Sequence, residues 1–292
     1  KQGYSIFWMV GISLEGCGIC MKKYNVAVVG ATGAVGLEMI KMLEMRDFPV
    51  SNLYLFASSR TAGQKLNFKG MEVVVEDIGK ITDYSLLATR YSLNFALFSA
   101  GASVSKEWAP RFASQGIFVI DNSSCFRMDK DVPLIVPEVN PQVLSKEKKI
   151  IANPNCSTIQ MVVVLKPLHD VSKIKRVIVS TYQAVSGAGG KALDEFQGQV
   201  RSWAKGEKIP PVAKLPYQIA FNVIPQIDVF LENGYTKEEM KMVNETQKIL
   251  GDDNIKISST CVRVPVMRGH SEAVWIETEE KITSQDARDI LK

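Results

Sequence analysis

The sequence predicts an α/β protein in two parts: a first domain built on a mostly parallel sheet, followed by an α+β domain. Short apolar strands alternate with amphipathic helices in the first half of the chain. The pattern changes after Asn153-Pro154-Asn155, and 292 residues exceed the usual size of one core, about 100–200 residues per domain. With 46% hydrophobic and 23% charged residues, the chain has the composition of a globular protein.

The first domain is expected to run from residue 22 to 152. It begins with a strand at Asn25–Val29 and a helix from about Val35 to Arg46. Further buried strands are predicted at Leu53–Phe56, Val73–Val75, Phe95–Phe98 and Ile117–Ile120, with a helical segment near Lys106–Ser114. This alternation of strands and helices is typical of a parallel sheet that is covered on both faces.

The second domain is expected to span residues 153–292. Helices are predicted at Cys156–Leu165, Lys191–Arg201, Thr236–Leu250 and Thr283–Leu291, and strands at Val177–Tyr182, Ile255–Val264 and Ala273–Glu277. Several prolines indicate irregular loop between residues 204 and 235. Because the last predicted helix has no C-terminal cap or polar tail after it, we expect a chain that stops within its second domain.

Residues 1–21 are interpreted as an N-terminal extension outside the fold. Their apolar run Tyr4–Leu14 resembles a secretory signal only weakly, and no later apolar stretch reaches the roughly 18 residues of a membrane span. The five cysteines lack metal or disulfide spacing, and the pair Cys17 and Cys20 is given no role. A net charge of +4 without a basic run argues against nucleic-acid binding. We expect a soluble, cytoplasmic protein without a metal or membrane partner.

Glycines at positions 30, 33 and 36 follow the first strand directly and begin the first helix. This arrangement permits a tight turn, close approach of the backbone and free N–H groups at the positive end of a helix, all of which suit a pyrophosphate. It predicts a Rossmann-type dinucleotide-binding domain. A glycine-rich structural turn is the alternative interpretation.

The segment after the second strand favours NADP over NAD. An acidic residue about twenty positions after the glycines would bind the ribose 2′-hydroxyl of NAD. The sequence has no Asp or Glu between Asp47 and Glu72, and Ala57-Ser58-Ser59-Arg60-Thr61 offers a guanidinium and hydroxyls instead. These groups suit a 2′-phosphate. The alternative is that Arg60 is a solvated loop residue.

Asn153-Pro154-Asn155-Cys156-Ser157 places a cysteine where a loop becomes a helix. A helix N-terminus stabilises a thiolate and supplies N–H donors for an oxyanion, as covalent acyl chemistry requires. Cys156 is therefore the predicted nucleophile, although a lone cysteine is more often a small buried hydrophobe.

A thiol nucleophile needs a base, and His169 and His270 are the two histidines of the chain. On one helix, His169 would lie about 20 Å from Cys156 at 1.5 Å per residue, unless Pro167 broke the helix, so it is interpreted as structural. His270 follows Gly269 on the approach to a strand, where a side chain can face a site. His270 is the predicted base, with a hydrogen-bonded structural residue as the alternative.

Two further polar side chains stand in apolar strands. Arg263 lies within the predicted strand that includes Cys261–Val266, where its charge must be met by an internal salt bridge or by the carboxylate of a substrate. Gln183 ends another strand just before the turn Ser186-Gly187-Ala188-Gly189-Gly190 and can be presented to a substrate.

The motifs GATGAVG, DNSSCFR, VPEVN, NPNCSTI, STYQAVSGAGG and RVPVMRGH occur in this order. Together they resemble the motif set of the bacterial and fungal aspartate-semialdehyde dehydrogenases, from about residue 24 to the end. The resemblance implies a catalytic and dimerisation domain after the NADP-binding domain, in a homodimer or homotetramer. It also implies reversible, NADPH-dependent reductive dephosphorylation of L-aspartyl-4-phosphate to L-aspartate-4-semialdehyde, in the biosynthesis of lysine, threonine, methionine and isoleucine.

The same resemblance implies a role for each motif position. Cys156 would carry the acyl thioester, His270 would be the acid and base, and Gln183 would position the substrate. Arg263 would hold the α-carboxylate and Glu238 the amino group of the substrate. The implied ligands of inorganic phosphate are Arg127 and Lys241, and those of NADP are Gly30, Thr32, Gly33, Ala34, Val35, Ser58, Arg60, Thr61, Ser186 and Gly187.

The chain departs from the family pattern by its N-terminal extension and by a missing C-terminal portion, which in this family returns a helix with a nicotinamide contact to the cofactor domain. A rival enzyme is N-acetyl-γ-glutamyl-phosphate reductase, whose cysteine motif resembles NPGCYPT. A rival of another class is a truncated, non-catalytic NADP-binding protein. Intact Cys156, Gln183, Arg263 and His270 count against the second rival.

Overall fold

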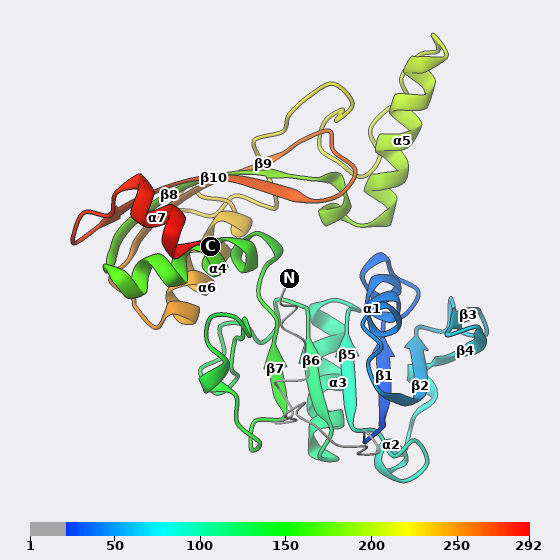
Figure 1. Ribbon diagram of the computed structural model, residues 1–292. Helices are drawn as coiled ribbons and strands as arrows, with labels where there is room; N and C mark the ends of the chain where they lie inside the picture. The colour runs from blue at the N-terminus through cyan, green and yellow to red at the C-terminus, as the bar shows by residue number, and fades with distance from the viewer. Residues whose placement is uncertain (1–21) are drawn as a thin grey trace. The chain divides into compact units, whose positions relative to one another are not determined.

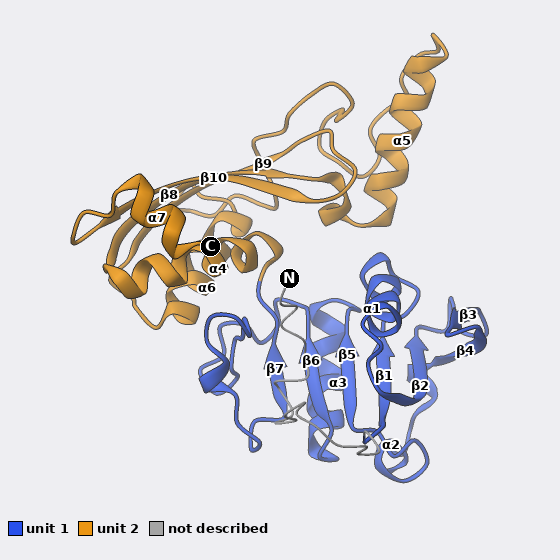
Figure 2. Ribbon diagram, viewed as in Figure 1, with its two compact units in different colours: residues 1–154 blue, residues 155–292 orange. Residues whose placement is uncertain are grey.

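The computed structural model describes residues 22–292, and the chain divides into two compact units between Pro154 and Asn155 (Figure 2). The predicted N-terminal extension, including Cys17 and Cys20, lies outside the described residues. In the described part, no helix is both long and apolar enough to cross a membrane. Each unit has its own sheet and its own hydrophobic core.

Unit 1 is built on a seven-stranded sheet in the order β3-β4-β2-β1-β5-β6-β7 (Figure 1). Its strands are β1 (Tyr24–Val29), β2 (Val50–Ala57), β3 (Lys65–Phe68), β4 (Met71–Asp77), β5 (Phe95–Phe98), β6 (Phe118–Asp121) and β7 (Ile150–Ala152). Only β3 runs antiparallel to its neighbour; the other pairs are parallel. Without β3, the order is that of a doubly wound dinucleotide-binding sheet. The predicted Rossmann-type parallel sheet is confirmed.

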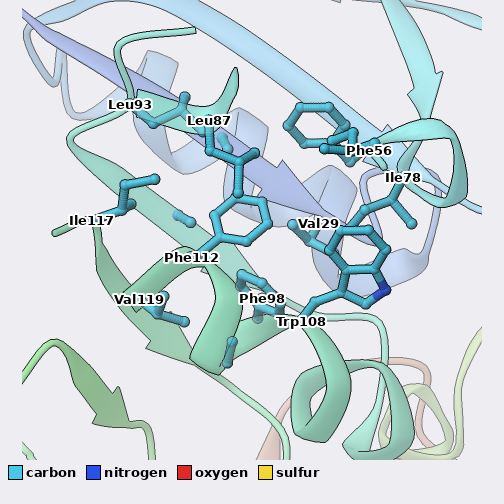
Figure 3. Packing of buried hydrophobic residues seen from close by; sticks show 14 of the residues in the cluster. Val29, Phe56, Ile78, Leu87, Leu93, Phe98, Trp108, Phe112, Ile117 and Val119 are labelled. Carbon is cyan, nitrogen blue, oxygen red and sulfur yellow. The ribbon is translucent and has the colours of Figure 1, made fainter. Parts of the chain in front are cut away.

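Helices cover both faces of this sheet, as its alternating side chains require. Val26 and Val28 of β1 belong to the core beneath α1 (Ala34–Met45), whereas Ala27 and Val29 belong to the core beneath α2 (Ser85–Thr89) and α3 (Ala102–Ser114). In the second core, the aromatic rings of α3 pack against β1 and β5 (Figure 3). Burial on both faces is the physical reason that these strands are apolar throughout.

Unit 2 has a three-stranded sheet in the order β10-β8-β9, with β9 parallel and β10 antiparallel to β8. Its elements are α4 (Cys156–Val171), β8 (Ile174–Gln183), α5 (Gly190–Ala204), α6 (Lys237–Leu250), β9 (Lys256–Arg263), β10 (His270–Thr278) and α7 (Ser284–Ile290). Apolar side chains of α4 and α6 pack on one face of the sheet, among them Met161, Leu165 and Met242. This mixed architecture confirms the predicted α+β part.

The sequence patterns missed short elements and misplaced some boundaries. β3, β7 and α2 are too short to show a period. The predicted helix Cys156–Leu165 was too short: α4 continues through Pro167 to Val171. Leu168 is buried in line with Met161 and Leu165, and this burial offsets the helix hydrogen bond that Pro167 cannot donate.

Candidate active site

The glycine loop of unit 1 lies where the strand order reverses between β1 and β5, the usual position of a ligand in a doubly wound sheet. Gly30 has φ of 85°, and a Cβ at this position would lie 2.8 Å from the backbone nitrogen of Ala100. A Cβ on Gly36 would collide with the carbonyl oxygen of Gly30. Any side chain here would therefore push α1 or the β5 loop away, so both positions need glycine.

The residues around this loop fit a dinucleotide phosphate. α1 begins after Gly33 with no side-chain cap and no acidic residue in its first turn, so no carboxylate competes for its positive end. Thr32 Oγ1 and Thr61 Oγ1 lie 3.0 Å apart, which joins the glycine loop to the turn after β2. In that turn the amide of Thr61 donates to the carbonyl oxygen of Ser58, and Arg60 is exposed.

In unit 2, strand register brings together residues that are distant in the sequence. Gln183 of β8 pairs with His270 of β10 on one side and with Arg263 of β9 on the other. Because directly paired residues point to the same face of a sheet, the three side chains form one row at the end of the face that α4 and α6 cover. We call His270, Gln183 and Arg263 the catalytic row.

Cys156 is the first residue of α4, and its sulfur faces this row. Cys156 Sγ lies 3.2 Å from His270 Nε2, and the thiol is exposed whereas the imidazole is half-buried. Burial lowers the pKa of His270, and the positive charge of Arg263 acts in the same direction. His169 lies far along the same helix, buried, where its Nδ1 accepts a hydrogen bond from the amide of Ile174 at 3.2 Å.

The first turn of α4 is held by Asn155. Its Oδ1 accepts hydrogen bonds from the amides of Ser157 at 2.9 Å and Thr158 at 3.2 Å. The backbone N–H of Asn155 donates to Oε2 of the buried Glu245 at 2.6 Å. Two free N–H groups of the helix are thereby satisfied, and the peptide that precedes the nucleophile is tied to α6.

The carboxylate of Glu238 accepts hydrogen bonds from three side chains around the site. Its Oε1 accepts from Asn155 Nδ2 at 2.8 Å and from Gln183 Nε2 at 3.1 Å, and its Oε2 accepts from Lys241 Nζ at 3.0 Å. Burial alone would raise the pKa of Glu238, but Lys241 and the two amides outweigh burial and lower it. Lys241 also pairs with Asp228 Oδ2 at 3.2 Å, and the two carboxylates raise the pKa of Lys241 despite its burial.

Arg263 is a buried guanidinium, with 6% of its surface exposed. Its Nη1 donates to the carbonyl oxygen of Ala184 at 2.8 Å, and within residues 22–292 no carboxylate lies within ion-pair distance of it. Burial lowers the pKa of Arg263, although the nearby Glu238 and Cys156 act in the opposite direction. Of the two alternatives from the sequence, the internal salt bridge does not form within residues 22–292, and the contact of Arg263 with a substrate carboxylate stays a prediction.

Gly187 packs directly on the catalytic row. A Cβ at this position would lie 2.9 Å from Arg263 Nη1 and 3.4 Å from His270 Nε2. Gly187 and Ser186 therefore belong to unit 2, near the catalytic row, while the other predicted NADP ligands belong to unit 1. Their role in cofactor binding stays a prediction.

Arg127 belongs to unit 1, in the loop after β6. Its Nη2 donates to the carbonyl oxygen of Asn122 at 2.9 Å, and its side chain is buried. The loop is organised by Asp121, which accepts from Ser105 Oγ at 2.6 Å and from Ser123 Oγ at 2.7 Å. The predicted contact of Arg127 with phosphate stays a prediction.

Sequence reasoning missed Asn155, Asp228 and Glu245. Asn155 had a signal, because an Asn directly before Cys-Ser-Thr at a helix start is a typical N-cap. Asp228 and Glu245 act through contacts with Lys241 and Asn155 that are distant in the sequence. No local pattern reports such contacts.

A doubly wound dinucleotide-binding sheet and a paired cysteine and histidine are together the parts of a nicotinamide-dependent dehydrogenase with a thiol nucleophile. The models of known families agree: residues 25–147 match the semialdehyde dehydrogenase NAD binding domain, and residues 165–292 match the semialdehyde dehydrogenase dimerisation domain. The chain belongs to the aspartate-semialdehyde dehydrogenase family, so the resemblance inferred from the motifs is confirmed. An oxidoreductase with an NAD(P)-binding domain is confirmed with it.

Individual relatives cover most of the chain. An aspartate-semialdehyde dehydrogenase of Aquifex aeolicus is 57% identical over 92% of this chain and 78% of its own length. The crystal structure of aspartate semialdehyde dehydrogenase II from Vibrio cholerae has a TM-score of 0.87 at 50% identity, covering 92% of this chain and 79% of its own. The enzyme from Candida albicans, solved with NADP, has a TM-score of 0.68 at 27% identity, with coverages of 92% and 76%.

Proposed function

We propose that this chain catalyses the reversible, NADP-dependent and phosphorylating oxidation of L-aspartate-4-semialdehyde to L-aspartyl-4-phosphate. In the biosynthetic direction, NADPH reduces the acyl phosphate, on the route to lysine, threonine, methionine and isoleucine. The single observation that carries the proposal is the position of Cys156 Sγ, 3.2 Å from His270 Nε2 and at the first residue of α4. The choice of L-aspartate-4-semialdehyde among possible aldehydes rests on the family to which the chain belongs.

Cys156 acts as a thiolate nucleophile. The N-terminus of α4 and the guanidinium of Arg263 both favour negative charge on the sulfur. The sulfur attacks the aldehyde carbon, so that a C–S bond forms and the carbonyl π pair moves to oxygen. His270, the predicted acid and base, lies beside the sulfur to assist at this oxygen.

Arg263 and Gln183 bind and orient the substrate. The guanidinium of Arg263 offers planar, paired donors to the α-carboxylate, and its burial strengthens that attraction because little water competes. Gln183 projects from the centre of the catalytic row and is held by Glu238. The substrate ammonium group binds Glu238, which it must share with Lys241.

NADP binds at the glycine loop of unit 1, with Gly30, Gly33 and the start of α1 at its pyrophosphate. The exposed Arg60 and the hydroxyls of Ser58 and Thr61 meet its 2′-phosphate. When bound, the cofactor supplies or accepts the hydride. The residues of the loop fit this group, since a Cβ on Gly30 or Gly36 would collide with the backbone around the loop and displace the start of α1.

Lys241 supports the use of inorganic phosphate, as does Arg127, and a substitution of Lys241 tests this role. Lys241→Ala should raise KM for phosphate selectively, because a held ammonium group near the nucleophile is lost. The matched control is Lys237→Ala, an exposed lysine on the same helix. If K241A and K237A give the same KM for phosphate, Lys241 has no part in its binding.

A homodimer forms through the face of the three-stranded sheet that α4 and α6 leave open. Ile178, Tyr182 and Trp275 are exposed on this face, and residues 165–292 match a dimerisation domain. Trp275→Glu should shift sedimentation velocity toward monomer, whereas Met71→Glu, at a somewhat more exposed position of unit 1, should not. If the W275E variant sediments like the wild type, this face is not the dimer interface. The sedimentation coefficient of the wild type also distinguishes a dimer from a tetramer.

The proposed compartment is the cytoplasm, because the mechanism needs a reduced thiol at Cys156. The decisive assay of the proposed function follows NADPH formation from L-aspartate-4-semialdehyde with and without phosphate. We expect phosphate-dependent turnover that Cys156→Ser abolishes. Preference for N-acetylglutamate semialdehyde would favour the rival reductase, since an acetylated amine has no charge to pair with Glu238.

A further inference from the structure

The ammonium group of Lys241 has two carboxylate partners in unit 2. Its Nζ donates to Glu238 Oε2 at 3.0 Å and to Asp228 Oδ2 at 3.2 Å. Only 8% of the Glu238 side chain is exposed, whereas 34% of the Asp228 side chain is exposed. An ammonium group has three N–H donors, so within residues 22–292 these bonds leave one donor for a ligand. An anion that reaches Lys241 from solvent therefore meets Asp228, the more exposed of the two partners.

All three groups carry their charge at neutral pH. Burial would raise the pKa of Asp228, but the N–H of Val229 and the ammonium group of Lys241 outweigh it and lower that pKa. The pKa of Glu238 is lowered as well, and the pKa of Lys241 is raised. One ammonium group and two carboxylates together carry a net negative charge. Coulomb repulsion therefore opposes a phosphate dianion at the position where Lys241 attracts it.

The backbone holds Asp228 beside Lys241. Asp228 has φ of 69°, in the left-handed region that Asp and Asn enter more readily than most residues. Its Oδ1 accepts from the N–H of Val229 at 2.9 Å, and the carbonyl oxygen of Val229 accepts from the N–H of Lys237 at 2.9 Å, at the start of α6. On the other side, Ile227 is buried in the core of unit 2. Because both neighbours of Asp228 are anchored, its carboxylate stays near Lys241.

We propose that Asp228 sets the affinity for inorganic phosphate, because its carboxylate competes with phosphate for the ammonium group of Lys241 and keeps phosphate binding weak. This inference rests on the proposed function, in which Lys241 supports the use of phosphate. It makes Asp228 a positioning residue that acts through Lys241. In the biosynthetic direction phosphate is a product that has to leave, so weak binding favours turnover there.

A purely structural role of Asp228 predicts the opposite effect. If Asp228 only held Lys241 in place, loss of its charge would free the ammonium group and weaken phosphate binding. If Asp228 competes with phosphate, loss of its charge strengthens phosphate binding. Asp228→Asn separates the two roles by the sign of the change. Asn also tolerates a positive φ, and its Oδ1 can still accept from Val229.

The first test is the KM for inorganic phosphate in the oxidation of L-aspartate-4-semialdehyde. We expect D228N to lower this KM by roughly three- to tenfold, because the repulsion of one nearby carboxylate is removed. Glu232→Gln, which neutralises an exposed carboxylate of the same loop, is the control and should leave the KM for phosphate unchanged. A KM in D228N that equals or exceeds that of the wild type would overturn the proposal, and so would an equal decrease in E232Q.

The second test measures phosphate binding without turnover. Ligand binding raises Tm, so Tm is followed as inorganic phosphate is added, with sodium chloride of matched ionic strength as the reference. D228N should reach a given rise in Tm at a lower phosphate concentration than the wild type. In a Lys241→Ala background the same substitution should have a much smaller effect, because the group for which Asp228 competes is gone.

Two outcomes of the melting curves contradict the proposal. One is a D228N protein that binds phosphate no more tightly than the wild type, including the case in which neither binds it. The other is an equal gain from Asp228→Asn with and without Lys241, because Asp228 would then not act through Lys241. The melting curves need no aldehyde, so they test this inference apart from the proposed function, which fails if wild-type turnover does not depend on phosphate.

Discussion

Asn155 Nδ2 donates a hydrogen bond to Glu238 Oε1 at 2.8 Å, and this contact links the loop before the nucleophile to helix α6. Oδ1 of the same side chain caps α4, because it accepts hydrogen bonds from the backbone N–H groups of Ser157 and Thr158. One side chain therefore holds the first turn of the nucleophile helix and the carboxylate that positions Gln183.

Asn155→Ala should lower kcat strongly and destabilise the protein by about 0.5–2 kcal/mol, the usual effect of losing an N-cap. The nucleophile helix then loses the cap and the link to Glu238 together. The measurements are kcat and urea unfolding. Thr283→Ala, which removes the cap of α7, is the control that should lose stability and keep its activity. Full activity of N155A would show that the cap does not position Cys156.

Gly187→Ala should reduce kcat/KM for the aldehyde by roughly tenfold or more with little change in unfolding. The new Cβ would lie 2.9 Å from Arg263 Nη1, so the guanidinium must move away from its place in the catalytic row. Gly190→Ala is the control, since a Cβ there meets no atom within 4 Å. Equal kinetics for G187A and G190A would exclude steric control of Arg263 at this position.

Arg60→Ala should raise KM for NADP by roughly ten- to a hundredfold and leave KM for NAD almost unchanged, because only NADP carries the 2′-phosphate. Steady-state kinetics with both cofactors is the measurement. Lys41→Ala, which removes an exposed cation of α1, should alter neither constant. Parallel changes in both constants would mean that Arg60 acts on the fold or the pyrophosphate instead.

Arg263→Lys should cost about 1–3 kcal/mol of transition-state stabilisation although the charge is kept. An ammonium lacks the paired planar donors, and it cannot serve both Ala184 and a substrate carboxylate in the same geometry. The check is kcat/KM for L-aspartate-4-semialdehyde against that for an aldehyde without a carboxylate. If kcat/KM falls by the same factor for both aldehydes, Arg263 does not bind the substrate carboxylate.

The cofactor domain could be predicted from local patterns because its signals are local. The glycines sit between one strand and one helix, and β5 was predicted with its observed limits, Phe95–Phe98. The absence of an acidic residue between Asp47 and Glu72 is likewise visible in the sequence. Short elements such as β7 have too few residues to show a period.

The catalytic row could be predicted residue by residue but not as an arrangement. Gln183, Arg263 and His270 become neighbours only through the pairing of three strands, and register over such separations is set by the packed sheet. The same holds for Glu238, predicted as a ligand of the substrate and found as the acceptor of Asn155, Gln183 and Lys241. A sequence names such residues without showing how many partners each has.

The central claim is a covalent thioester on Cys156, and the most direct measurement is the mass of the intact protein after mixing with L-aspartate-4-semialdehyde and NADP in the absence of phosphate. We predict an adduct of one acyl group, mapped by peptide digestion to Cys156, which disappears when phosphate is added and never forms in Cys156→Ser. An unmodified protein that nevertheless produces NADPH, or an adduct on Cys125 or Cys261, would contradict the account.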